Sequence, residues 1–173
     1  VSNGTVTISV TDVQLAMIAS AAKNTGTIKI DVSGLKVNAI VIPSKVISVV
    51  DNASSSADIE VVLSNGTVAL DKAAINAIKD KGDAKISIET VDNAKLSDTQ
   101  KAVLGTQANT AVVVDVNVYV NGTKTSTFHN GKIHVSVPYM LKSGENADSI
   151  TVWFIKDDGT IEPKSGTYSD GTV

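Results

Sequence analysis

The stretch AIVIPSKVISVVDNASSSADIEVVL, residues 39–63, contains the pattern on which the fold depends. A short apolar strand is followed by a helix with Val and Ile on one face, and then by a strand in which apolar and polar residues alternate. The same pattern occurs earlier in VTISVTDVQLAMIASAAKNTGTIKIDV, residues 6–32, and later in TVALDKAAINAIKDKGDAKISIET, residues 67–90. Helices this short are marginal alone, so each is expected to pack on the strands beside it.

Polar residues mark the positions at which these helices are expected to begin. A hydroxyl followed three residues later by Gln fits the capping box, in which side chain and backbone satisfy each other's hydrogen bonds. This pattern occurs at Thr11 and again at Ser97, which precedes a fourth helix. Ser44 and Asp71 are predicted to cap the other two helices.

The helical signal ends near residue 108, and tight turns between alternating segments follow. Asn-Gly and Asp-Gly favour type I′ hairpin turns because both residues accept positive φ angles. The predicted turns are Asn121-Gly122, Asn130-Gly131, Asp158-Gly159 and Asp170-Gly171. We therefore predict a β-rich α+β fold: a strand–helix repeat domain over residues 1–107, with sheet and helices packed together, and an antiparallel β meander or small sandwich over residues 108–173.

The composition excludes several classes of site. The 173 residues include no cysteine and no arginine, so disulfides, thiolate nucleophiles and the usual bidentate grip on phosphate are absent. A net charge of −3 argues against nucleic acid and anionic membranes as partners. No apolar run reaches the roughly 20 residues that span a bilayer. Val1 is not an initiator methionine, so the chain is expected to be a piece of a longer protein.

Few residues are candidates for chemistry. His129 and His134 have turn and polar-face positions and lack an obvious carboxylate neighbour, so we expect surface histidines and no metal site or cofactor. Asp157, Asp158 and Glu162 lack the spacing of an EF-hand loop, which leaves open only a weak calcium site. Serine, histidine and aspartate all occur, but no motif marks a nucleophile. An enzyme is therefore the least favoured class.

Trp153 is the most distinctive single residue. It alternates out of phase with Val152 and Phe154, so it faces the other way if those two face the core. Together with Tyr119 and Tyr139, an outward Trp153 could stack on a sugar ring. We favour the competing interpretation, in which both faces of the strand are covered and Trp153 fills a second core.

Two segments resemble parts of large extracellular proteins of Gram-positive bacteria that carry S-layer homology modules. AIVIPSKVISVV and GTVALDKAAINAIKDKGDAKISIETVD are similar to their strand–helix repeats. GKIHVSVPYMLKSGENADSITVWFIKDDGTIEPKSGTYSDGTV is similar to a β module that accompanies the anchoring modules. In that module a further strand usually follows the final Gly-Thr-Val, so the second domain is expected to lack a last strand. The resemblance implies an extracellular, cell-wall or S-layer location and supplies no catalytic residues.

The expected function is therefore a non-catalytic structural and assembly module of a secreted cell-surface protein. Its expected partners are neighbouring domains of the same protein, further copies through strand pairing, and cell-wall polysaccharide, without membrane insertion. The alternative is a carbohydrate-binding accessory module of a secreted polysaccharide-degrading enzyme, with Trp153, Tyr119 and Tyr139 as contacts. Surface domains of this kind sometimes carry Lys–Asn isopeptide cross-links beside a carboxylate, but the spacing identifies no such trio.

Overall fold

The computed structural model describes residues 1–106, 111–156, 158 and 160–173, and its fold is α+β and rich in β structure, as predicted. Contacts group the chain into two compact units, and each is described by itself. The first contains Val1–Glu89 and Val116–Val135, and the second contains Thr90–Asp115 and Ser136–Val173.

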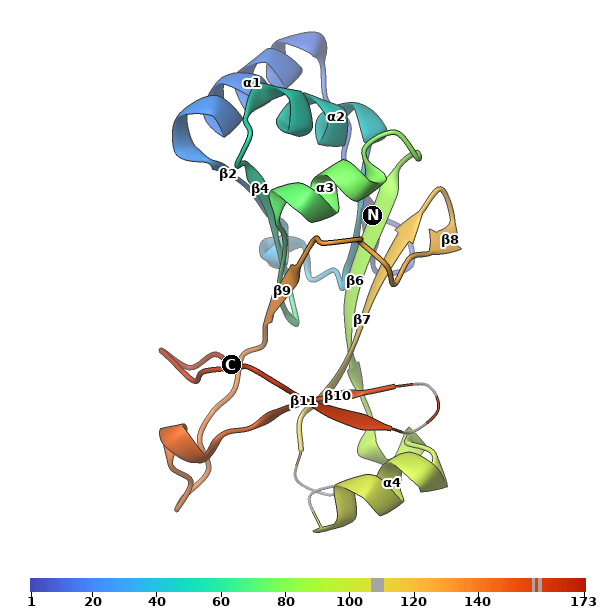
Figure 1. Cartoon of the computed structure of the whole chain (residues 1–173), viewed down its shortest axis with the longest axis vertical. Helices are drawn as coiled ribbons and strands as arrows, with labels where there is room; N and C mark the ends of the chain where they lie inside the picture. The colour runs from blue at the N-terminus through green and yellow to red at the C-terminus, as the bar shows by residue number, and fades with distance from the viewer. Residues whose placement is uncertain (107–110, 157, 159) are drawn as a thin grey trace. The chain divides into compact units, whose positions relative to one another are not determined.

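The elements follow one another along the chain as in Figure 1. The strands are β1 Thr5–Thr7, β2 Thr27–Asp31, β3 Ala39–Ile42, β4 Asp58–Leu63, β5 Gly66–Leu70, β6 Ala84–Val91, β7 Val113–Val120, β8 Thr123–Lys124, β9 Ile133–Ser136, β10 Val152–Ile155 and β11 Ile161–Lys164. The helices are α1 Asp12–Thr25, α2 Ser44–Ala53, α3 Lys72–Ile78 and α4 Asp98–Leu104, with short 3-10 turns η1 Ser33–Leu35, η2 Asn93–Lys95 and η4 Ala147–Ser149.

Each predicted repeat connects two different sheets of the first unit. The first sheet has the strand order β1-β3-β6-β7-β8, and the second sheet has the order β2-β4-β5-β9. The repeats β1-α1-β2 and β3-α2-β4 lie side by side, because β1 pairs in parallel with β3 and β2 pairs in parallel with β4. The third repeat, β5-α3-β6, runs in the opposite sense, and its strands pair antiparallel with β3 and β4. Figure 1 shows α1, α2 and α3 gathered at one end of these strands.

The core of the first unit is made of methyl and β-branched groups. Burial alternates strictly in β4 and β5, where every second residue is buried, whereas β3 and β6 also contain consecutive buried residues. The largest fully buried side chains are Ile40, Ile42, Ile86 and Ile88 from one sheet, Ile59 and Leu70 from the other, and Ile47, Ile75 and Ile78 from helices. At about 25 cal/mol per Å² of apolar surface removed from water, this burial is what fixes the short helices on the strands.

Three of the four predicted helix caps are confirmed. Thr11 and Ser97 each form a complete capping box, and the Asp71 side chain accepts from the Ala74 amide. The prediction for Ser44 is wrong: Ser44 is the first residue of α2, and its amide donates to Asp83 Oδ1 at 2.8 Å. A carboxylate distant in sequence therefore serves as the cap.

The predicted turns are confirmed where both residues have positive φ angles. Asn121 and Gly122 have φ angles of 48° and 79°, and Asp170 and Gly171 have angles of 50° and 80°. In the turn at Asn130-Gly131 the positive φ is at His129, and the Gly131 amide donates to the carbonyl of Phe128, so Asn130-Gly131 is not a type I′ turn. In the turn predicted at Asp158-Gly159, Gly159 lies outside the described residues.

The second unit has antiparallel pairing but little buried apolar surface. Strands β10 and β11 form an antiparallel pair, and the backbones of Val137 and Val173 bond each other in both directions. In the described part of this unit, Leu96 is the one buried apolar residue. The division into units does not fall at a single boundary after residue 107. Most of β7 belongs to the first unit, where β7 lies beside β6 in one sheet.

Candidate functional site

The most buried ionic cluster lies between α2 and α3. Asp51, at the end of α2, has a side chain only 5% exposed. Its Oδ1 lies 2.7 Å from Lys72 Nζ and its Oδ2 lies 2.7 Å from Lys79 Nζ. The Asn76 amide lies 3.5 Å from Oδ1, and Lys72 also donates to the Asp51 carbonyl. Two residues of α3 and the residue that follows it, each about one turn from the next, therefore surround a single carboxylate.

The pKa shifts in this cluster favour the charged forms of Asp51 and Lys79. Burial raises the pKa of the Asp51 carboxyl, but hydrogen bonds from Lys72 and Lys79 outweigh it and leave that pKa below its ordinary value. The hydrogen bond to Asp51 raises the pKa of Lys79. An isopeptide cross-link from Lys79 to the Asn76 amide would require the Lys79 amine to lose its proton first. The raised pKa of Lys79 opposes that step. The arrangement suits an ion pair that joins two helices.

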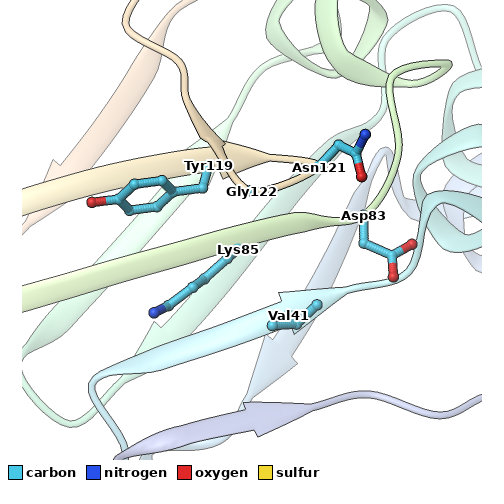
Figure 2. A pocket seen from close by; sticks show the side chains of 6 residues that line it. All are labelled: Val41, Asp83, Lys85, Tyr119, Asn121 and Gly122. Carbon is cyan, nitrogen blue, oxygen red and sulfur yellow. The ribbon is translucent and has the colours of Figure 1, made fainter.

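An open depression of about 430 Å³ lies on the outer side of the first sheet, lined by Val41, Asp83, Lys85, Tyr119, Asn121 and Gly122. In Figure 2 the side chains of Lys85 and Tyr119 extend in the same direction, with Lys85 Nζ 5.9 Å from the ring centroid. Asp83 already caps α2, and its carbonyl accepts from the Asn121 amide. The polar groups here mainly hold the ends of strands and a helix.

The neighbouring residue Asn117 is buried although its strand position suggests an outward face. It lies on the same side of β7 as Tyr119, and only 7% of it is exposed. Its Oδ1 has no hydrogen-bond partner within the described residues. An unmet buried acceptor reduces stability by about 1–3 kcal/mol. The atom is closed off by the protein around it, so it does not line the depression.

The three aromatic residues predicted as sugar contacts do not form one surface within a unit. Tyr119 belongs to the first unit, whereas Trp153 and Tyr139 belong to the second. The Tyr139 hydroxyl donates to Glu145 Oε2 at 2.8 Å, and its ring meets Tyr168 edge-on at 85°. The Tyr139 side chain is therefore held by residues of its own unit.

The interpretation of Trp153 as the centre of a second core is wrong. Trp153 is 47% exposed and Phe154 is 50% exposed, so neither face of β10 is closed. The Trp153 indole Nε1 donates to Thr151 Oγ1 at 2.9 Å, which fixes the ring along its own strand. Trp153 is therefore an oriented, half-exposed aromatic side chain.

The predicted surface positions of both histidines are confirmed, since His129 and His134 are exposed. The carboxylates suggested for calcium already have partners: Asp158 accepts from Thr160, and Glu162 pairs with Lys156 and Lys164. These bonds lower the pKa of both carboxyl groups. Asp157, the third candidate, lies outside the described residues.

Two structurally important acids were missed at the sequence level. Asp51 follows Val46, Ile47 and Val50 at helical spacing, so its place on the apolar face of α2 was a readable signal of a buried carboxylate. Asp83 gave no such signal, because it bonds an amide 39 residues away in the sequence. Local pattern cannot identify a partner at that distance.

The described residues also limit other classes of site. Across them, His, Asp and Glu do not gather in groups of three or more that could hold a metal ion. No helix among them has the length and apolar character needed to cross a bilayer. Searches of protein-family models, curated proteins and solved structures found no significant match. The resemblance to S-layer-associated proteins therefore stays a prediction.

Proposed function

We propose that this chain is a non-catalytic structural and assembly module of a secreted, cell-surface or S-layer-associated protein. The proposal combines the sequence resemblance with the use made of charged side chains in the fold. Its partners would be neighbouring domains of a longer surface protein, further copies of the chain, and cell-wall polysaccharide. Its location would be outside the cell.

The observation that carries the proposal is the role of three acidic side chains in the first unit. Asp51 joins α2 to α3 through two lysines. Asp71 caps α3 with Oδ1 and accepts from the Lys132 amide with Oδ2 at 2.9 Å. Asp83, before β6, caps α2. Each carboxylate connects segments distant in sequence and so helps to hold the fold rigid, which supports a structural role for these acids.

Location provides the direct test of this role. An antibody against the chain would be applied to cytosolic, membrane, cell-wall and medium fractions of the organism that makes it. We expect the signal in the cell-wall fraction, released by agents that strip surface layers, with a cytosolic enzyme as the fractionation control. A signal confined to the cytosol would exclude a surface scaffold.

A carbohydrate-binding accessory module is the second candidate, favoured by the half-exposed Trp153 ring fixed by Thr151. It predicts retention on an insoluble polysaccharide such as glucan, xylan or cell-wall polymer, and loss of retention in Trp153→Ala. Met17→Ala, at an exposed apolar residue of the other unit, is the control. Wild-type protein that passes through all three polymers would remove this candidate.

A further inference from the structure

Strand β2, Thr27–Asp31, is an open edge of the second sheet. Within the described residues its one strand neighbour is β4. Thr27, Lys29 and Asp31 are exposed, whereas Ile28 is buried and Ile30 is half-buried. An open edge presents unpaired amide and carbonyl groups to any further strand.

The register with β4 shows which backbone groups face outward. The Gly26 carbonyl accepts from Asp58, and the Val32 amide donates to Val62, so even-numbered residues of this segment bond β4. In a parallel strand the alternate residues point their amide and carbonyl groups to the other side. Those of Lys29 and Asp31 therefore face outward, while the Thr27 carbonyl accepts from the Thr25 hydroxyl.

The side chains on this edge are self-complementary in charge. Lys29 and Asp31 lie two residues apart on one face of the sheet, one positive and one negative. If a second β2 pairs antiparallel about a two-fold axis at Ile30, each Lys29 lies opposite Asp31 of the partner subunit. That register also joins the outward groups of both residues in four backbone hydrogen bonds, and it covers the half-buried Ile30 with its symmetry mate.

The other edges of these sheets lack this combination. At β1, the outward amide and carbonyl of Thr5 are already bonded to Ser2. Strand β8 has only two residues. Strand β9, with the sequence IHVS, carries no acid to oppose its histidine. A lysine alone on an edge disfavours pairing, but a lysine two residues from an aspartate favours an antiparallel copy of itself.

We propose that two copies of this chain associate through antiparallel pairing of their β2 strands, in the register that places Lys29 opposite Asp31 of the partner subunit. The second sheet then continues across the two-fold axis from β4 of one copy to β4 of the other. Pairing through β2 depends on this edge alone, so it would survive a failure of the surface role proposed above.

Charge reversal tests the register. Sedimentation equilibrium of the wild-type chain should give a concentration-dependent dimer that weakens as salt rises. Lys29→Glu and Asp31→Lys should each raise the dimer dissociation constant at least about tenfold, because two like-charge contacts replace two favourable ones. The double variant Lys29→Glu/Asp31→Lys restores opposite charges and should recover most of the affinity. Lys36→Glu, an exposed change of equal charge outside β2, is the control.

Two further measurements keep the outcome clear. Lys29 pairs with Glu60 at 2.9 Å within one chain, so circular dichroism and thermal unfolding must show that each variant is folded. Amide hydrogen exchange should slow at Lys29 and Asp31 as concentration rises, which an interface elsewhere on the chain would not cause. A chain that stays monomeric to about 1 mM, or a dimer unaffected by either single reversal, would overturn the proposal.

Discussion

At the scale of single residues, the first unit contains a buried carboxylate whose partners are partly exposed. Asp51 is nearly inaccessible, whereas its partners Lys72 and Lys79 are 24% and 27% exposed. Removing a carboxylate from water is unfavourable, and only two close cations and an amide offset that cost. The cluster adds little over an apolar replacement, but loss of Asp51 leaves both lysines without their counter-charge.

Asp51→Asn should therefore destabilise the chain by about 2–3 kcal/mol, less than for a fully buried pair because the lysines reach water. Urea unfolding followed by far-UV circular dichroism would measure the change. Asp115→Asn, at an exposed carboxyl on β7, is the control and should shift stability by less than about 0.5 kcal/mol. Equal effects of the two variants would contradict a special role for Asp51.

The same carboxylate predicts an acid-dependent loss of stability. The pKa of Asp51 lies below its ordinary value of 3.8 in the folded chain, so the folded state binds its proton less readily than the unfolded state does. Its contribution is therefore complete above about pH 5 and disappears as pH falls through the folded pKa. The stability difference between wild type and Asp51→Asn should be constant from about pH 5 to 8 and shrink below about pH 4. A stability difference that grows at acid pH would contradict a lowered pKa of Asp51 in the folded chain.

At the scale of elements, helix ends are held by residues from elsewhere in the chain. The beginning of α2 is capped by Asp83, and the beginning of α3 lies against the turn before β9. Both junctions connect a helix to a distant segment. The short helices are therefore fixed at their amino ends as well as along their apolar faces.

The distant cap of α2 can be tested against its local alternative. Asp83→Ala should cost about 1 kcal/mol, the usual value of a helix cap, because the Ser44 amide loses its acceptor. Ser44→Ala should cost less than about 0.5 kcal/mol, because the Ser44 side chain caps nothing. Chemical denaturation of both variants measures the two losses of stability. A larger loss for Ser44→Ala would show that the Ser44 side chain caps α2 after all.

Gly131 tests the junction at α3. A methyl group there would clash with the backbone of Ala73 and Ala74, whereas one at Gly34 would meet nothing. Gly131→Ala should therefore destabilise the chain by about 1–3 kcal/mol, and Gly34→Ala should be neutral or slightly stabilising. The thermal midpoints of the two variants measure the contrast. Similar midpoints would mean that the turn moves away from α3 without cost.

At the scale of the whole molecule, the two units differ in how much apolar surface they bury. Among the described residues, every buried apolar residue except Leu96 belongs to the first unit. The second unit relies on a two-stranded pair, 3-10 turns and exposed ion pairs. Such elements contribute little independent stability.

The second unit should therefore unfold first. Trp153, the single tryptophan, reports on the second unit, whereas far-UV circular dichroism is dominated by α1, α2 and α3 of the first. We expect the fluorescence midpoint in urea to precede the circular dichroism midpoint, because local stability follows buried apolar area. Coincident midpoints would show that the two units unfold as one.

The local pattern predicted the elements well. Alternation at Ile59 and Val61, capping at Thr11 and Ser97, and the turn at Asn121 all depend on neighbouring residues, so they were readable in order along the chain. The candidate site was less predictable. Trp153 alternates correctly, yet alternation alone does not reveal whether anything covers its face.

The sequence by itself determined the β-rich α+β class and the strand–helix repeat, because hydrophobic period and capping chemistry act over a few residues. Only the tertiary structure decided that α1, α2 and α3 each link two different sheets, that Asp83 caps α2, and that Asp51 meets Lys72 and Lys79. The physical reason is distance along the chain. These contacts join segments tens of residues apart, and they exist only after the apolar faces have packed.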